Sequence, residues 1–210
     1  HGASPDQIEG GILGSVVPAL TGRVLGALRM FCSARFLTVG PGLKSGIKLR
    51  LDNPAQLGAE LLCGAVAALE EGPGPLAVIS ADTAISIMAV NGKQELVGGV
   101  ILPGPQLSLS ALVQKTAQLP QIDLSAPASS SILGKNTSAC LQNGFVLGTA
   151  GLLDGLAERF QAELGPDIRF YATGNLPRTI REACRTPIEY REYLITDGLY
   201  RIWQRNRKGS

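Results

Sequence analysis

Three strand-like segments follow one another between residues 75 and 102 and constrain the fold most: PLAVIS, ISIMAV and QELVGGVIL. A tight ADTA turn separates the first two segments. Asn91 and Gly92, a pair typical of type I′ hairpins, separate the second from the third. Antiparallel strands joined by such short turns form a meander. We therefore expect a three-stranded meander here.

Helices and one more strand follow this meander. A short helix is expected over residues 109–118, and Thr137 or Ser138 is expected to cap a long helix that runs to Leu164. The segment IRFYAT reads as a strand, and it is followed by a turn at residues 174–175, a helix over 179–184 and a C-terminal helix. Strands with helices packed behind them predict an α/β domain. One face of the long helix is expected to carry Leu152, Leu153, Leu156, Phe160 and Leu164.

The first third of the chain has a different order. GGILGSVV reads as a strand, a helix follows from Pro18, and ARFLTV reads as a second strand. A glycine-rich loop, GPGLKSG, leads into an extended segment and a helix that ends at Gly72. The loop contains Lys44 and Ser45, but its spacing does not match the phosphate-binding pattern GxxxxGK[ST]. The sequence EGPGP marks the expected domain boundary, which gives units of residues 1–74 and 75–210.

Composition narrows the class of protein. Of 210 residues, 45% are hydrophobic and 17% charged, and glycine and proline break every apolar run before the ~20 residues that span a bilayer. No signal-peptide layout is present, so we expect a cytoplasmic protein that does not associate with membranes. A net charge of +2 does not indicate nucleic-acid binding. The four cysteines form no CxxC pair and the single histidine is His1, so we expect no metal site from this chain's side chains.

Four segments, in order, resemble the type III pantothenate kinase family: VGPGLKSGIKLRLDNPAQLGAE, GGVILPGPQLSLSALVQKTAQLP, ILGKNTSACLQNGFVLGTAGLLDGLAERF and YATGNL. The resemblance extends from Ile8 to Asn206. It implies an actin/hexokinase/Hsp70-like fold, in which two ribonuclease-H-like domains enclose a nucleotide cleft. It also implies a dimer that transfers the γ-phosphoryl group of ATP to pantothenate, the first step of coenzyme A synthesis.

The chain departs from the family pattern at its start. Family members begin with a strand and an aspartate-glycine-asparagine-threonine turn that binds phosphate and metal, whereas this sequence joins the pattern at QIEGGILGSVVP. We therefore expect residues 1–74 to be a truncated first ribonuclease-H-like domain and residues 75–210 a complete second one. Such a truncation would leave sheet edges and apolar surface uncovered, which favours a partner.

A second departure affects the catalytic base. Where the family has glycine-alanine-aspartate-arginine, this chain has Gly58, Ala59, Glu60 and Leu61. The resemblance places Glu60 at the base position and Gly58 beside the substrate. The extra methylene of glutamate moves the carboxylate, and base catalysis depends on position. Leu61 cannot bind a carboxylate, and Glu60 has the alternative of being a solvated helix residue.

The second phosphate motif is also altered. Residues 80–86 read SADTAIS, so Asp82 stands where the family has the glycine that lets backbone amides approach phosphate. By resemblance, the nucleotide-binding positions are Thr83, Ser86, Gly174 and Asn175. Asp82 would turn a carboxylate towards an anion and oppose ATP binding. The alternative is that these residues now only close turns.

The family signature GKNT is intact at residues 134–137. By resemblance, Asn136 and Thr137 belong to the substrate site, with the threonine reaching the pantothenate pocket of the neighbouring subunit. Thr137 has the alternative of being a helix cap. The residues that match the family are therefore those that the resemblance places at the partner's site across the dimer interface. The residues that differ from the family are those of the chain's own nucleotide cleft.

These departures lead to three hypotheses. The first is a subunit of a heteromeric pantothenate kinase that is inactive alone and needs a full-length type III pantothenate kinase homologue. In that complex the partner's residues would form most of the binding sites for ATP, Mg²⁺ and K⁺. The second is a catalytically inactive pseudokinase or regulatory binding protein of the same fold. The third is an autonomous kinase that uses Glu60 as its base. We favour the first.

Overall fold

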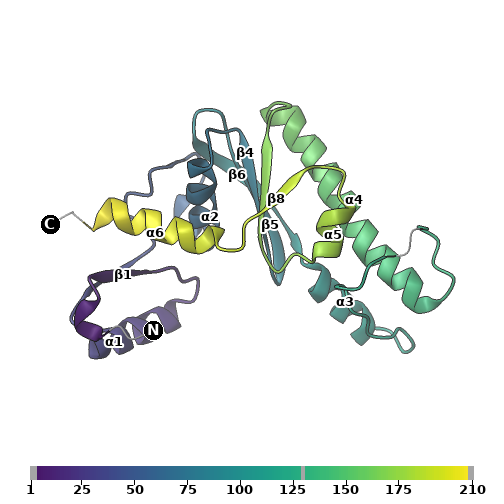
Figure 1. Ribbon diagram of the computed structural model, residues 1–210, viewed down its shortest axis with the longest axis horizontal. Coiled ribbons are helices and arrows are strands. Elements are labelled where there is room, and N and C mark those ends of the chain that lie inside the picture. Colours follow the sequence, from purple (N-terminus) through teal and green to yellow (C-terminus); the bar gives the residue numbers. More distant parts are fainter. Residues whose placement is uncertain (1–3, 129–130, 208–210) are drawn as a thin grey trace.

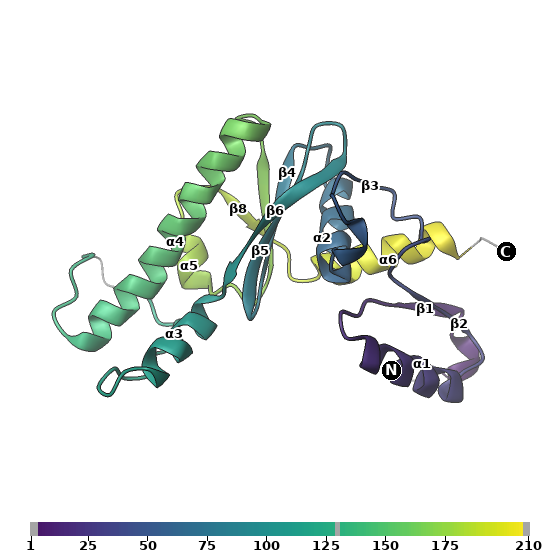
Figure 2. The same ribbon diagram turned by 180° about the vertical axis from the view of Figure 1, so that it is seen from behind.

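The computed structural model describes residues 4–128 and 131–207, so His1 lies outside the described part. A small two-stranded unit lies beside a six-stranded sheet that has helices on both faces (Figure 1). Figure 2 shows the same arrangement from behind. No helix within the described residues is long and apolar enough to cross a bilayer.

The small unit is a strand, a helix and a parallel strand. It follows a short 3₁₀ turn, Pro5–Gln7, and consists of β1 (Gly10–Leu13), α1 (Pro18–Phe31) and β2 (Arg35–Thr38). Strands β1 and β2 pair in parallel, from Gly10 opposite Arg35 to Leu13 opposite Thr38. Proline begins α1 favourably because the first helical N–H needs no partner. The predicted strands and helix are confirmed.

The six-stranded sheet has the order β3-β6-β5-β4-β7-β8. Its strands are β3 (Lys48–Leu49), β4 (Leu76–Ala81), β5 (Ala84–Val90), β6 (Glu95–Pro103), β7 (Arg169–Gly174) and β8 (Ile188–Tyr190). Strand β5 pairs antiparallel with β4 and β6, whereas β4 with β7, β7 with β8, and β3 with β6 are parallel. The predicted meander is therefore confirmed. The order β6-β5-β4-β7-β8, with one antiparallel strand, is the ribonuclease-H-like topology.

Helices cover both faces of this sheet. They are α2 (Ala59–Glu70), α3 (Pro105–Gln114), α4 (Thr137–Leu164), α5 (Arg178–Ala183) and α6 (Leu194–Asn206), and a 3₁₀ turn covers Pro54–Gln56. Leu76 and Val78 pack with residues of α2 and α6, whereas Ala77 and Ile79 pack with residues of α4 and α5. This alternation follows from the period of two along a strand. The mixed α/β class is confirmed.

The expected domain boundary at residue 74 stays a prediction. Strand β3 and helix α2 precede that position, yet β3 pairs with β6 and α2 packs against α6 and β4. In this structure, therefore, the segment around residues 48–70 contributes to the six-stranded sheet and its helical cover.

Two local predictions about turns and caps were wrong. Four residues, 91–94, separate β5 from β6, and Gln94, not Gly92, has the positive φ, at 59°, so the turn is not type I′. The side chain of Asn91 explains this, because its Oδ1 accepts hydrogen bonds from the N–H groups of Lys93 and Glu95. Likewise, α4 is capped by Asn136 rather than by Thr137 or Ser138.

Several predicted boundaries also moved. The helix expected over residues 109–118 begins at Pro105 and ends at Gln114, because proline suits the first helical position. Helix α2 begins only after Gly58. Strand β8 was missed, since three residues carry little periodicity. Leu152 is exposed, so it does not belong to the buried apolar face of the long helix on which the sequence placed it.

The direction of the helices sets which residues share an edge of the sheet. Helices α2 and α4 each precede a parallel strand, β4 and β7, and therefore run antiparallel to it. Their N-termini thus lie on the side of the carboxyl ends of β4 and β7 (Figure 1). Helix α4 is about 42 Å long and β7 about 20 Å, so α4 extends well beyond the sheet.

Candidate functional site

The carboxyl ends of β4 and β7 bring together two of the predicted nucleotide-binding turns. Asn175 donates a hydrogen bond from Nδ2 to Oδ1 of Asp82, at 3.0 Å, and its N–H donates to the carbonyl of Ala81. Gly174 has φ +81°, and a Cβ there would lie 2.3 Å from the Ala81 oxygen. Only glycine fits this close approach. The Asp82 carboxylate is thus held at the mouth of the turn by Asn175.

The other two predicted nucleotide positions differ from each other. Thr83 is exposed, and its carbonyl accepts a hydrogen bond from the N–H of Gly104, at 2.9 Å. Ser86 is buried within β5, opposite Ser80 of β4. The structure therefore places Thr83 with Asp82 and Asn175 at the exposed edge, whereas Ser86 faces the protein interior.

A cavity of about 730 Å³ lies between the small unit and α2. That volume is in the range of small-molecule sites. Gly58 is the N-cap of α2 and offers no side-chain cap, and its carbonyl accepts hydrogen bonds from the N–H groups of Leu61 and Leu62. The lining combines the end of β2, the glycine-rich loop, the 3₁₀ turn and α2, and includes Ser15, Val39, Gly40, Leu43, Ser45, Asn53, Gln56, Gly58, Leu62 and Ile202.

Glu60 lies beside this cavity rather than in it. It is exposed in the first turn of α2 and lines a smaller hollow of about 190 Å³. The two hollows share Ser15, Val16 and Ala59. A carboxylate in the first helical turn is favoured by the helix dipole. Leu61 packs at the margin of the apolar core, so no positive side chain stands beside Glu60 at that position.

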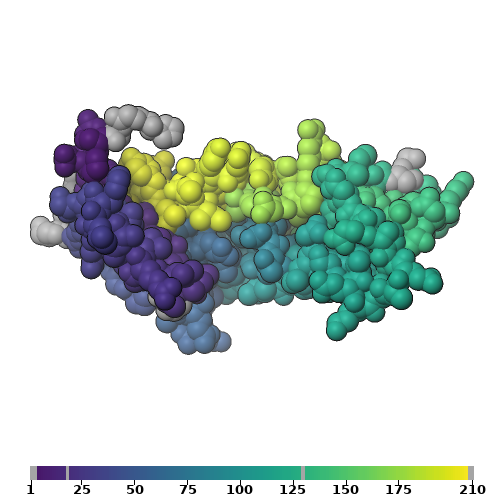
Figure 3. Space-filling model, turned by 90° about the horizontal axis from the view of Figure 1, so that it is seen from below, coloured from purple at the N-terminus to yellow at the C-terminus, as the bar shows by residue number. Residues whose placement is uncertain are grey.

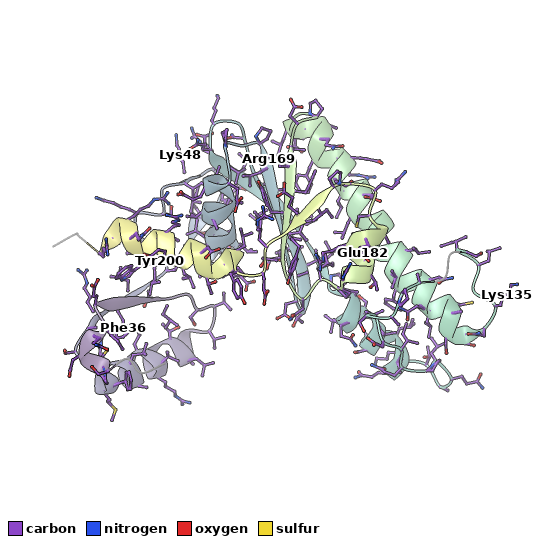
Figure 4. The ribbon with its side chains drawn as sticks, viewed as in Figure 1. Phe36, Lys48, Lys135, Arg169, Glu182 and Tyr200 are labelled. Atoms are coloured by element: carbon purple, nitrogen blue, oxygen red, sulfur yellow. The ribbon has the colours of Figure 1, made fainter. Side chains whose placement is uncertain are left out.

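Asn136 and Thr137 lie at the far end of α4. Oδ1 of Asn136 accepts a hydrogen bond from the N–H of Ala139, at 2.9 Å, and caps the helix. Thr137 is the first helical residue and is exposed. Lys135, which precedes them, is at the opposite end of the molecule from Tyr200 of α6 (Figure 4). The structure therefore does not bring Thr137 to the chain's own cavity.

Sequence reasoning missed how α6 contacts the cavity wall. Ile202 of α6 lines the cavity, and Asn206 bonds to Lys44 of the glycine-rich loop. These contacts join residues about 160 positions apart, and no sequence pattern signalled them. Within the described residues, no group of three or more His, Cys, Asp and Glu side chains is placed to hold a metal ion.

The sheet order and the flanking helices define a protein of the actin/hexokinase/Hsp70-like class. A crystal structure of a conserved protein of the Baf family of transcriptional activators, from Campylobacter jejuni, aligns with a TM-score of 0.56. The alignment covers 93% of this chain and 82% of that one, at 18% identity, and supports the fold alone.

Sequence comparison gives the family. A family model of type III pantothenate kinase matches residues 2–159. Type III pantothenate kinase from Koribacter versatilis is 36% identical over 97% of this chain and 73% of its own length. The enzyme from Geobacter sulfurreducens is 38% identical over 99% and 80%, respectively. The chain belongs to the type III pantothenate kinase family.

Proposed function

We propose that this chain is a cytoplasmic subunit of a type III pantothenate kinase that gains activity with a complete homologous partner. The observation that carries the proposal is the division of its site residues. The turn at the end of β4 carries a carboxylate where phosphate should bind, whereas the GKNT sequence is intact at residues 134–137.

The Asp82 turn opposes ATP binding in the chain's own cleft. Phosphoryl transfer depends on positioning and on neutralising the charge of the γ-phosphate. Asp82 is exposed and held by Asn175, so an approaching triphosphate would meet a fixed negative charge. This turn therefore suits an ATP phosphate poorly. We assign ATP, Mg²⁺ and K⁺ mainly to the partner.

The reaction itself is a simple transfer. A pantothenate hydroxyl attacks the γ-phosphorus, the bond to ADP breaks, and a base takes the hydroxyl proton. Glu60 is the candidate base in this chain, since it lines the hollow next to the cavity. The neighbouring Leu61 offers nothing to the substrate carboxylate. A glutamate in place of the family's aspartate, and Leu61 in place of its arginine, are consistent with at most weak catalysis by this chain alone.

The geometry of α4 supports a role across an interface. The first turn of α4, which begins at Thr137, extends well beyond the edge of the sheet (Figure 1), and Thr137 does not line the chain's own cavity. A capped helix start is a rigid platform, because Asn136 fixes the first turn. Thr137, and Asn136 beside it, are thus suited to complete the pantothenate pocket of a partner subunit.

A coupled kinase assay tests the proposal. Pantothenate phosphorylation is measured with Mg²⁺, ATP and K⁺ for this chain alone, for a complete homologue with an inactivating change at its own GKNT threonine, and for the two together. We expect activity only in the mixture, and its loss when this chain carries Thr137→Ala. Ser138→Ala, at the neighbouring exposed position, is the matched control.

Two results would contradict the proposal. Activity of this chain alone would restore Glu60 as a working base and make the chain an autonomous kinase. A mixture without activity, from two chains that associate, would favour the second candidate, a pseudokinase or regulatory binding protein. Asp82 is the observation that favours that candidate.

A further inference from the structure

The glycine-rich loop between β2 and β3 presents alternate residues to opposite sides. Leu43, Ser45 and Ile47 line the 730 Å³ cavity. Lys44 and Gly46 instead contact α6. Gly46 has φ +83°, a conformation that favours glycine, and the Arg205 guanidinium lies close to its Cα. This part of the loop is therefore a thin wall between the cavity and the last turn of α6, which carries Arg205 and Asn206.

Asn206, at the end of α6, pairs with both backbone groups of Lys44 on the side of the loop that faces away from the cavity. Its Oδ1 accepts from the N–H of Lys44 and its Nδ2 donates to the carbonyl of Lys44, both at 3.0 Å. The same Nδ2 donates to the carbonyl of Ile202, at 2.7 Å. Ile202 is fully buried and lines the cavity, so one side chain links two parts of its lining.

Arg205 adds a second hold on the loop. One guanidinium nitrogen donates to the carbonyl of Ser45, and the other lies 2.9 Å from Oε1 of Glu70 in α2. Both charged side chains are more than one third exposed, so the ion pair itself contributes little to stability. Its effect is positional, since it aligns α6 with α2, whose first turn lines the same cavity.

We propose that Asn206, supported by Arg205, is a positioning residue of the cavity. A loop with three glycines in seven residues loses much conformational entropy when ordered. The Asn206 bonds order it before a ligand arrives, which removes that cost from binding. The identity of the ligand, pantothenate, rests on the proposed function. The position of the wall rests only on the contacts described here.

Hydrogen exchange and calorimetry on the full chain test this role. Asn206→Ala removes both bonds to Lys44, and Gln204→Ala, an amide on the same helix that contacts Arg201 instead, is the matched control. For Asn206→Ala we expect faster exchange confined to residues 42–47 and about tenfold weaker pantothenate binding, as for the loss of one or two hydrogen bonds. Asn206→Asp, which keeps the acceptor for Lys44, should fall between.

The outcomes separate the two claims. Unchanged exchange in residues 42–47, or faster exchange spread over the whole sheet, would overturn the positioning role. Faster exchange in the loop with unchanged affinity would overturn it as well. If the unsubstituted chain, alone and with its partner, binds no pantothenate in the cavity, the assignment of pantothenate to this cavity fails, whereas the coupled kinase assay decides the proposed function. The hydrogen-exchange rate of residues 42–47 in Asn206→Ala then still shows whether Asn206 orders the loop.

Discussion

The two sheets of the molecule differ in how completely they are covered. In the six-stranded sheet, every residue of β4 and all but the first of β5 are buried. In the small unit, every residue of β1 is only partly buried. Helix α1 and its flanks expose large apolar side chains, Val16, Leu20, Val24, Met30 and Phe31. Figure 3 shows the small unit at one end of the molecule, beside α6.

This difference indicates where stability resides. The six-stranded sheet has helices on both faces and two separate apolar clusters. A two-stranded sheet is marginal by itself, so the small unit depends on its contacts with α6. Its glycines lie close to that helix: a Cβ on Gly10 would lie 3.2 Å from Nε1 of Trp203, and one on Gly14 would lie 3.3 Å from Leu199. We expect the small unit to open first on partial unfolding.

The largest effect is expected in the centre of the six-stranded sheet. Ile85 is fully buried in β5, within the cluster that packs against α4. Ile85→Ala should lower the free energy of unfolding by about 3 kcal/mol, through lost burial and a cavity. Urea titration measures this. Leu20→Ala, on the exposed face of α1, should cost less than about 1 kcal/mol. Equal losses for the two variants would refute the comparison.

Asp154 should give the next largest effect, because it joins α4 to the segment before β8. The buried carboxylate accepts hydrogen bonds from the N–H groups of Arg185, at 3.0 Å, and Thr186, at 2.9 Å. Asp154→Asn should cost about 2 kcal/mol, since one amide oxygen cannot replace these bonds. Thermal unfolding at pH 7 measures this, and Glu158→Gln, an exposed acid on the same helix, is the control.

The same carboxylate predicts a pH dependence. Burial raises the pKa of Asp154, but the hydrogen bonds from Arg185 and Thr186 outweigh it and hold the pKa below its ordinary value. A lowered folded pKa means that the contribution is present above the unfolded value, about 3.9, and is lost as pH falls through the folded pKa. The stability difference between the protein and Asp154→Asn should therefore narrow below about pH 4. A constant difference down to pH 2 would contradict this.

The comparison also explains what the sequence could predict. Apolar runs separated by turn residues predicted the meander in residues 75–102, since both are local signals. The predicted hairpin type was wrong because the Asn91 side chain accepts hydrogen bonds from the N–H groups of Lys93 and Glu95 and so favours a different turn. Strand β8 was missed because it has only three residues, and its pairing with β7 joins segments that are separate along the chain.

The site was predicted less completely than the fold. Family resemblance located Glu60 and the Asp82 turn, but not the bond between Asp82 and Asn175, which lie 93 residues apart. The hold of Asn206 on Lys44 spans 162 residues. Such contacts arise only once the helices are placed, so a pattern along the chain carries no trace of them.

Trp203 tests the link between the two regions. Its indole lies against Gly10 and stacks on Tyr200, with ring centroids 5.9 Å apart. Trp203→Ala should lower the overall free energy of unfolding by about 1.5 kcal/mol, less than a central core residue, because the ring is only half-buried. Hydrogen exchange should accelerate chiefly in residues 10–13 and 35–38. An equal acceleration in β4 would show that the two regions open together.

The smallest effect on stability, and the sharpest on function, is expected at the edge of the covered sheet. Asp82 is exposed, and Asp82→Gly removes one hydrogen bond to Asn175 and should cost less than about 1 kcal/mol. It also removes the negative charge from the turn and lets a ligand approach the backbone more closely. Titration with a non-hydrolysable ATP analogue and Mg²⁺ should show tighter binding, by about tenfold, whereas Asp82→Asn should recover only the part due to charge. Unchanged affinity in both variants would mean that the turn is not what weakens nucleotide binding, and would move the defect to the small unit.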